Sequence, residues 1–142
     1  MEDGNHYGRS EADWNELARD GLAYLKERAR LGRTTSYTEM NAVLSRRTSQ
    51  PPFDFSSDAD RAAMGYLLGR IVEADRPESG LMISALVIYL EGNDAGTGFY
   101  RLAEQLEALR PKATATERES FWVDQLQRIY EAGRAPRRRS SS

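Results

Sequence analysis

Apolar residues recur at helical spacing along the first long segment of the chain, residues 11–31. The positions on its apolar side are Trp14, Leu17, Ala18, Gly21, Leu22, Leu25 and Ala29. This pattern predicts a long amphipathic helix. Ser10 is the expected N-cap, with Asp13 three residues later in a relative of the capping box, and Gly32 is the expected end. Glycine inside a helix costs about 1 kcal/mol relative to alanine, so we expect Gly21 to mark a close contact with another helix.

A second amphipathic helix is predicted to begin directly after the sequence "GRTT". Ser36 and Glu39 have the spacing of a capping box, in which the serine hydroxyl accepts from the Glu39 amide and the carboxylate accepts from the Ser36 amide. The apolar face of this helix is made by Tyr37, Met40, Val43 and Leu44.

A loop from residue 46 to residue 57 follows, because a Pro-Pro pair interrupts any helix there. We expect Phe53 and Phe55 to hold this loop against the core. The third predicted helix covers residues 59–74, with Ser57 or Asp58 as its cap. Its inward positions are Ala62, Ala63, Tyr66, Leu67 and Ile71.

The sequence "GLMISALVIYLEG", residues 80–92, is almost entirely apolar and rich in β-branched residues. It predicts one strand that is covered on both faces. A glycine-rich loop and a helix over residues 99–109 come next. Thr116 and Glu119 repeat the capping-box spacing and predict a last helix that runs to Ala132 and ends at Gly133.

The expected fold is therefore mostly α with a small β component, in the α+β class. We expect residues 1–9 to form a disordered N-terminus, residues 10–133 a single globular domain, and residues 134–142 a basic disordered tail.

Composition narrows the possible chemistry. The 142 residues contain no cysteine and one histidine, His6, which excludes thiolate nucleophiles, cysteine zinc sites and histidine-dependent triads. No catalytic set of residues converges, so we expect a non-enzymatic protein with no metal and no cofactor. No apolar run approaches the roughly 20 residues of a membrane span, and the N-terminus lacks the apolar segment of a signal peptide. We expect a soluble, cytoplasmic protein without a membrane partner.

Charge is distributed unevenly along the chain. The last nine residues, "RAPRRRSSS", hold four arginines and no acid, which leaves the rest of the chain at a formal charge of −6. Residues 26–50 nevertheless carry a local charge of +4. The cations of that segment are Lys26, Arg28, Arg30, Arg33, Arg46 and Arg47. An acidic body with one basic segment and one basic tail indicates a polarised surface.

The basic segment includes a run of hydroxyls beside a predicted helix start. Exposed amides and the positive end of the helix dipole favour an anion at such a place. We therefore interpret part of this segment as phosphate contacts, made by Arg33, Thr34, Thr35, Ser36 and Tyr37, with Arg46 and Arg47 beside them. The alternative interpretation is a plain helix junction, in which Gly32 ends one helix and Tyr37 packs beneath the next.

A family resemblance supports the first interpretation. The sequences "GRTTSYTEMNAVL" and "RAAMGYLLGR" resemble segments of the winged-helix DNA-binding domain of alkyltransferase-like proteins and O6-alkylguanine-DNA alkyltransferases, over residues 31–99. The resemblance implies a winged-helix-like core, with additional N- and C-terminal helices, and it assigns DNA contact to Arg61. Ser84 stands where the family has its alkyl-accepting cysteine, so without that thiolate we expect no alkyl transfer. What the resemblance carries over is a scaffold for binding DNA.

The glycine-rich sequence "EGNDAGTGFY" has neither the lysine of a P-loop nor a G-x-G-x-x-G pattern. We interpret it as a structural turn. Asp94 is the one residue there that we would test as an acid or a metal ligand.

The leading hypothesis is thus a non-enzymatic nucleic-acid-binding or regulatory protein that contacts DNA weakly and without sequence preference. The alternative is a protein–protein interaction module, or an accessory subunit of a larger complex, with an acidic binding surface. The tertiary structure distinguishes them: Arg33, Arg46, Arg47 and Arg61 gathered on one face favour the first, and dispersed ones favour the second.

Overall fold

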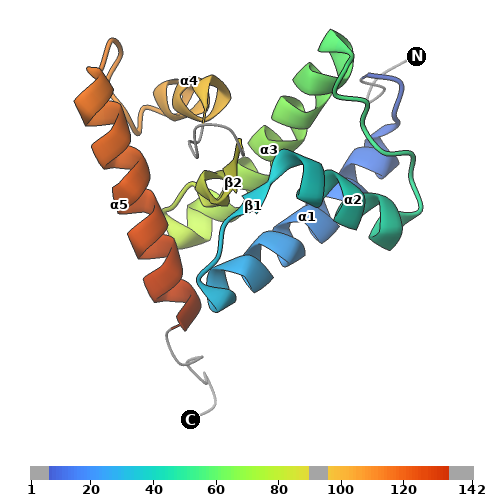
Figure 1. The fold of residues 1–142 in the computed structure, drawn as a ribbon, viewed down its shortest axis with the longest axis horizontal. Helices are drawn as coiled ribbons and strands as arrows, with labels where there is room; N and C mark the ends of the chain where they lie inside the picture. Colours follow the sequence, from blue (N-terminus) through green and yellow to red (C-terminus); the bar gives the residue numbers. More distant parts are fainter. Residues whose placement is uncertain (1–6, 90–95, 135–142) are drawn as a thin grey trace.

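The computed structural model describes residues 7–89 and 96–134 (Figure 1). Within these ranges the helices are α1 (Glu11–Leu31), α2 (Tyr37–Thr48), α3 (Asp58–Ser79), α4 (Thr97–Gln105) and α5 (Ala115–Arg134). Two short strands, β1 (Thr35–Ser36) and β2 (Val87–Ile88), form a parallel pair, and a 3-10 turn, η1 (Ile83–Leu86), precedes β2. The fold is mostly α with a small β component, as the sequence predicts. No helix in the described ranges is long and apolar enough to cross a membrane.

Helix α1 lies at the centre of the fold, in contact with α2, α3, α5 and η1. Gly21, in the middle of α1, allows the closest of these approaches. A Cβ atom built there would lie 2.7 Å from Cδ1 of Ile71 on α3 and 3.3 Å from Cε of Met40 on α2. The expected helix contact at Gly21 is therefore confirmed, and it explains why a residue of low helix propensity is used at this position.

The predicted ends of α1 and the start of α2 agree with the structure. Ser10 and Asp13 form a reciprocal capping box, and Gly32 ends α1 in the left-handed conformation, with φ 66°. The Ser36 hydroxyl accepts from the Glu39 amide at 3.0 Å. The Glu39 carboxylate instead accepts from Thr35 Oγ1 at 3.2 Å, so only half of the predicted box at α2 forms.

The start of α5 differs from the prediction. Thr114, not Thr116, caps this helix: its hydroxyl accepts from the Glu117 amide at 3.1 Å, and the Glu117 carboxylate accepts from the Thr114 amide at 2.8 Å. Arg110 also donates to that carboxylate at 2.7 Å. These bonds to Glu117 hold its pKa below the ordinary value. The sequence contains two overlapping T-x-x-E spacings, and the structure uses the first.

We expect Thr114→Ala to lower the free energy of unfolding by about 0.5–2 kcal/mol, the usual effect of losing an N-cap. Thr116→Ala is the matched control, because Thr116 lies exposed inside α5, and its removal should change stability by less than about 0.5 kcal/mol. Urea denaturation followed by circular dichroism measures both. A larger loss at Thr116 would contradict the assigned cap.

Of the predicted strand over residues 80–92, the described part, residues 80–89, has a strand at Val87–Ile88, paired in parallel with Thr35–Ser36; residues 90–92 lie outside the described ranges. Residues 83–86 form a 3-10 turn because α5 satisfies the nearby backbone: Gln125 accepts from the Met82 amide at 2.7 Å, and the Trp122 indole donates to the Ala85 carbonyl at 3.0 Å. A continuous apolar run does not distinguish a strand from another buried segment.

Helix α3 also runs further than the sequence pattern indicates. It continues to Ser79, with Pro77 inside its last turns, and ends at Gly80 in the left-handed conformation, with φ 71°.

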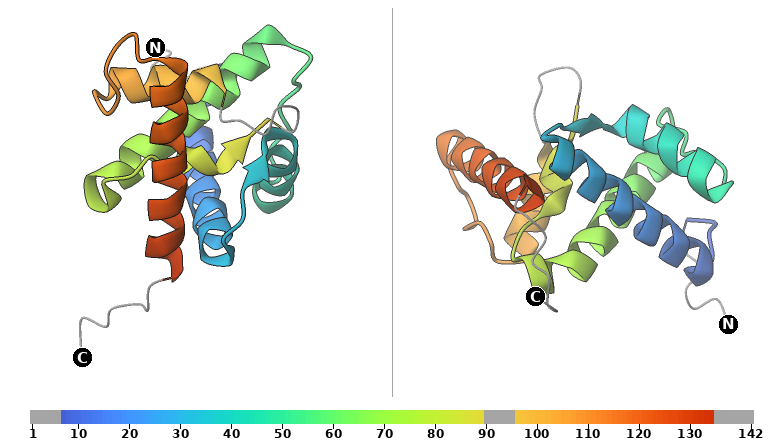
Figure 2. Two further views of the ribbon diagram at one scale, coloured as in Figure 1. Left: turned by 60° about the vertical axis from the view of Figure 1, so that its left-hand side comes forward. Right: turned by 90° about the horizontal axis from the view of Figure 1, so that it is seen from below.

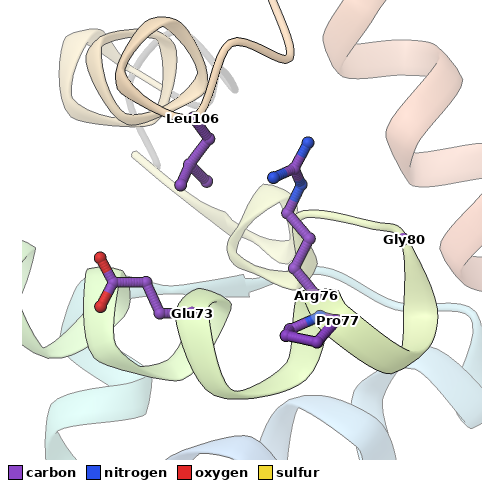
Figure 3. Close-up of a pocket in the computed structure, with 5 residues that line it drawn as sticks. All are labelled: Glu73, Arg76, Pro77, Gly80 and Leu106. Carbon is purple, nitrogen blue, oxygen red and sulfur yellow. The ribbon is translucent and has the colours of Figure 1, made fainter.

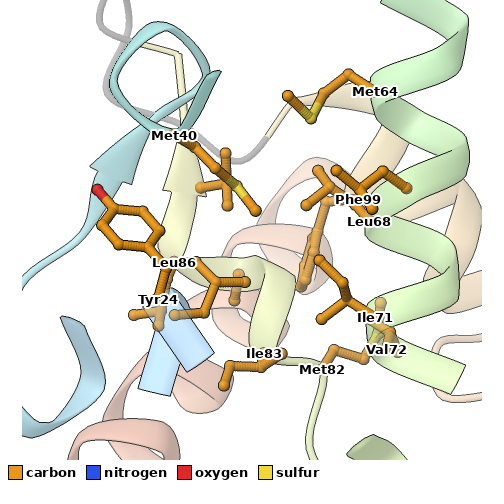
Figure 4. Packing of buried hydrophobic residues seen from close by; sticks show 14 of the residues in the cluster. Tyr24, Met40, Met64, Leu68, Ile71, Val72, Met82, Ile83, Leu86 and Phe99 are labelled. Carbon is orange, nitrogen blue, oxygen red and sulfur yellow. The ribbon is translucent and has the colours of Figure 1, made fainter. Parts of the chain in front are cut away.

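One hydrophobic cluster joins these elements (Figure 4). Methionines from three segments meet in it, Met40 of α2, Met64 of α3 and Met82 before η1, and all three are almost fully buried. Ile71 of α3 and Leu86 of η1 lie between them. Helix α5 reaches the same cluster through its buried residue Ile129, so the described parts of the chain share a single core.

The segment before α1 is described from residue 7 onward, and residues 1–6 lie outside the described ranges. Tyr7 packs on Trp14 and Tyr66, with ring centroids 6.3 and 5.7 Å apart. The Arg9 guanidinium lies 4.4 Å from the centroid of the Phe53 ring. At the other end, Arg134 belongs to α5, and the basic tail from residue 135 lies outside the described part of the chain.

The loop between α2 and α3 is held as predicted. Phe53 is buried, and Phe55 is half-buried against the core. Asn41 of α2 fixes the loop backbone from both sides, because its amide donates to the Phe53 carbonyl at 2.9 Å and accepts from the Phe53 amide at 2.8 Å.

Candidate functional site

Two hydroxyls of the "RTTS" stretch, those of Thr35 and Ser36, lie inside the fold. Thr35 and Ser36 are 3% and 7% exposed. The Thr35 hydroxyl lies 2.6 Å from the Tyr24 hydroxyl and donates to Glu39, while Ser36 caps α2. These groups are occupied in the folded protein, so the expected phosphate contacts from Thr35 and Ser36 have no free hydroxyl to make them.

The neighbours of these two residues are also engaged. Arg28 donates to the Thr34 carbonyl at 2.7 Å. The Tyr37 ring packs on the Tyr89 ring, with centroids 4.7 Å apart, and burial raises the pKa of Tyr37 well above its usual value. Tyr37 is therefore a neutral packing residue, as the helix-junction interpretation expects.

The predicted arginines do not gather on one face. Arg33 follows α1, Arg46 and Arg47 lie in the last turn of α2, and Arg61 lies in the first turns of α3. Figure 1 shows these three places at separate sides of the molecule. Arg61 pairs with Asp58 and donates to the Phe55 carbonyl. By the criterion given above, this dispersal counts against the site in its predicted form and favours the alternative of a protein–protein interaction module.

Arg47 is held by contacts that lie far away in the sequence. Its guanidinium donates to both oxygens of Glu27, at 3.1 and 2.9 Å, and lies 5.5 Å from the centroid of the Tyr24 ring. The bonds from Arg47 lower the pKa of Glu27, and those to Glu27 raise the pKa of Arg47. Both side chains are partly exposed, so solvent screens the pair. Arg47 is not available as a free cation.

A different set of cations lines the outer face of α1. Arg19, Lys26 and Arg30 are exposed and spaced seven and four residues apart, which places them on the side of the helix opposite the buried residues. Arg33 follows directly after Gly32 and is also exposed. We call these four residues, Arg19, Lys26, Arg30 and Arg33, the basic ridge.

The cations of the basic ridge have few direct acidic partners, although Glu27 attracts Arg30 electrostatically. In the described part of the chain, Lys26, Arg30 and Arg33 make no ion pair and no side-chain hydrogen bond. Arg19 has only Asp20 at 3.9 Å, with its own side chain 71% exposed. The acids of α1 turn elsewhere: Glu27 binds Arg47, and Glu16 accepts from Gln50 at 2.7 Å. The outer face of α1 therefore carries a net positive field.

The C-terminal end of α5 meets the end of the basic ridge. A Cβ built on Gly133 would lie 2.8 Å from both the carbonyl carbon and the oxygen of Ala29, and 3.0 Å from the Arg30 nitrogen. Figures 1 and 2 both show the ends of α1 and α5 side by side. Arg134 is the next residue, and three further arginines follow at 137–139, outside the described residues. The two basic regions of the sequence thus begin at one corner of the fold.

Sequence reasoning placed Lys26 and Arg30 in the basic segment and Arg134 in the basic tail, but it did not name them as contact residues and did not single out Arg19. The signal was present in the helical spacing of Arg19, Lys26 and Arg30 on the polar side of the predicted first helix. The sequence pattern predicts that Gly133 ends the last helix. In the structure Gly133 lies inside α5, where α5 contacts the end of α1.

In residues 7–89 and 96–134, no group of three acidic or histidine side chains is placed to hold a metal ion. Asp94 of the glycine-rich loop lies outside the described residues. Comparison with known proteins finds no match among family models, curated proteins or solved structures. The winged-helix resemblance therefore stays a prediction that rests on its short motifs.

Proposed function

We propose that the protein binds nucleic acid, weakly and without sequence preference, through the basic ridge and the arginine-rich tail. The observation that carries this proposal is the contact of Gly133 with the Ala29–Arg30 peptide. It brings Lys26, Arg30 and Arg33 of the basic ridge close to the start of a tail with three more arginines. The winged-helix resemblance of residues 31–99 agrees in kind, although the contacting residues differ from those that it assigns.

The ridge suits phosphate better than base edges. Ala23, which lies between Arg19 and Lys26 on the same side of α1, carries no hydrogen-bonding side chain that could read a base. Contacts with the phosphate backbone position a protein on DNA without reading its sequence. The acidic remainder of the protein repels a polyanion elsewhere, so contact is confined to this corner. Nonspecific binding of this kind has dissociation constants of about 10⁻⁴–10⁻⁶ M at physiological salt.

Fluorescence anisotropy with labelled duplex and single-stranded DNA tests the proposal over a range of salt concentrations. If the ridge neutralises three to four phosphates, the logarithm of the binding constant should fall against the logarithm of the salt concentration with a slope of about −3 to −4 for duplex DNA. Sequences of different composition should bind alike.

Charge reversal with a matched control locates the binding surface. We expect Arg30→Glu with Arg33→Glu to abolish measurable binding. Arg101→Glu with Lys112→Glu changes the net charge equally at exposed positions outside the ridge and should leave most of the affinity. The unfolding midpoint of each variant is measured as well, because Arg30 also lies in the last turn of α1, where cations stabilise the helix.

Deleting residues 135–142 should weaken binding without abolishing it. If binding disappears with the tail and survives the reversal of Arg30 and Arg33, the ridge is not a binding surface and the tail alone attracts polyanions.

A second candidate is a protein interaction on the outer face of α5. Val123 is 38% exposed there and lies between Glu119 and Asp124 in a shallow groove of about 340 Å³. An apolar residue flanked by acids suits a basic amphipathic helix. Absence of binding to every nucleic acid by the intact protein would make this candidate the leading one.

A further inference from the structure

A pocket of about 440 Å³ lies between the end of α3 and the end of α4 (Figure 3). Four of its residues, Glu73, Arg76, Pro77 and Gly80, lie on one face at the C-terminal end of α3. Leu106, the C-cap of α4, lies across from them. The volume is within the roughly 300–1,000 Å³ of small-molecule sites. None of these residues belongs to the basic ridge.

No described residue pairs with either charged side chain of this pocket. Glu73 and Arg76 are three residues apart, close enough for an ion pair on a helix, yet the described residues supply no ion pair or hydrogen bond to either side chain. Figure 3 shows why: the Arg76 side chain rises toward Leu106, whereas the Glu73 carboxylate points away from it. Arg76 is partly exposed, so its guanidinium can meet a ligand from solvent.

Pro77 leaves a third polar group, the backbone carbonyl of Glu73, without its helical hydrogen bond. It has no backbone N–H, so it cannot donate to the carbonyl of Glu73 four residues earlier. That carbonyl lacks its usual helical partner on the same face as the Glu73 carboxylate. The pocket therefore offers acceptors at Glu73, a planar donor at Arg76 and apolar surface at Pro77 and Leu106.

We propose that this pocket binds a small zwitterion with an apolar side chain, of the class of free α-amino acids. The ligand's carboxylate accepts both donors of the Arg76 fork, its ammonium donates to the oxygens of Glu73, and its side chain packs on Pro77 and Leu106. A simple anion would be repelled by Glu73 and a simple cation by Arg76, so only a molecule with both charges compensates the pair. This site is independent of the nucleic-acid surface.

Isothermal titration calorimetry with L-leucine as the probe tests the proposal. Leucinamide, which lacks the carboxylate, and N-acetyl-L-leucine, which lacks the ammonium, should each bind at least about tenfold more weakly, because each loses a charged hydrogen bond. Arg76→Gln and Glu73→Gln should each weaken L-leucine binding by a similar factor. Glu78→Gln and Arg101→Gln, at exposed positions outside the pocket, should leave it unchanged.

Arg76→Lys keeps the charge and loses the fork, so it should bind with intermediate affinity; it also serves if Arg76→Gln does not fold, as judged by its unfolding midpoint. The proposal is overturned if L-leucine gives no saturable heat with the intact protein. It is equally overturned if leucinamide or N-acetyl-L-leucine binds as tightly as L-leucine, or if Glu73→Gln and the Arg76 variants bind it like the unaltered chain.

Discussion

Replacing Trp14 with alanine is expected to lower the free energy of unfolding by about 3–5 kcal/mol, the range for removing a large aromatic side chain from a core. Trp14 is fully buried. Its ring lies edge-on to Tyr66 of α3 at 4.8 Å and stacks on Phe53 at 6.2 Å. It therefore joins α1, α3 and the loop after α2, and small domains have only about 5–15 kcal/mol of stability to lose.

Equilibrium urea denaturation measures this loss, with Val123→Ala as the control. Val123 is partly exposed on α5, so its truncation should change stability by less than about 0.5 kcal/mol. The Tyr7 ring also packs on the Trp14 ring. We therefore expect the segment before α1 to become sensitive to protease in Trp14→Ala. A loss below about 1 kcal/mol would show that the three elements are held together elsewhere.

The second large effect is expected at Gly133. Gly133→Ala places a methyl group against the backbone of Ala29 and Arg30, and backbone cannot move aside as the end of a flexible side chain can. Overpacking of this kind costs about 1–3 kcal/mol. Gly65→Ala is the matched control on α3, because a Cβ there meets nothing within 4 Å. That change should stabilise the protein by about 0.5–1 kcal/mol.

Because the same substitution is compared at two helical glycines, effects of opposite sign would separate the contact between α1 and α5 from helix propensity. Thermal unfolding of both variants gives the comparison. If the end of α5 must move away from α1, the tail also moves from the basic ridge, so we expect DNA binding at low salt to weaken in Gly133→Ala and not in Gly65→Ala. Stabilisation by both variants would mean that the two helix ends are not in contact.

Local signals in the sequence were sufficient for both ends of α1 and for the starts of α2 and α3, whereas the predicted ends of α3 and α4 differ from Ser79 and Gln105. Ser10, Ser36 and Gly32 act where the pattern places them, because capping depends on hydrogen bonds between residues three or four positions apart. The same local logic was ambiguous at α5, where Thr114 and Thr116 offer equivalent spacings. At α5 Arg110 donates a hydrogen bond to Glu117 and thereby stabilises the first of the two capping boxes.

Residues 80–92 are a segment whose secondary structure the hydrophobic pattern did not determine. An all-apolar run indicates that a segment is buried, but it does not indicate which groups form hydrogen bonds with the backbone of that segment. Gln125 and Trp122 of α5 supply those partners around Met82 and Ala85, and among the described residues of this run the strand covers Val87–Ile88. These contacts cross about forty residues of sequence, as the separations of 43 and 37 positions show.

The sequence by itself determined that the chain folds into amphipathic helices around a buried apolar segment, with positive charge concentrated in two regions. Only the tertiary structure decided which of those charges face solvent unpaired. Arg47 is paired with Glu27, twenty positions away, whereas Lys26 and Arg30 lie on the open side of α1. Helix periodicity and caps are fixed by near neighbours, so they can be read along the chain. The pairing of a charge, like the contact of Gly133 with Ala29, depends on which distant segment packing brings beside it.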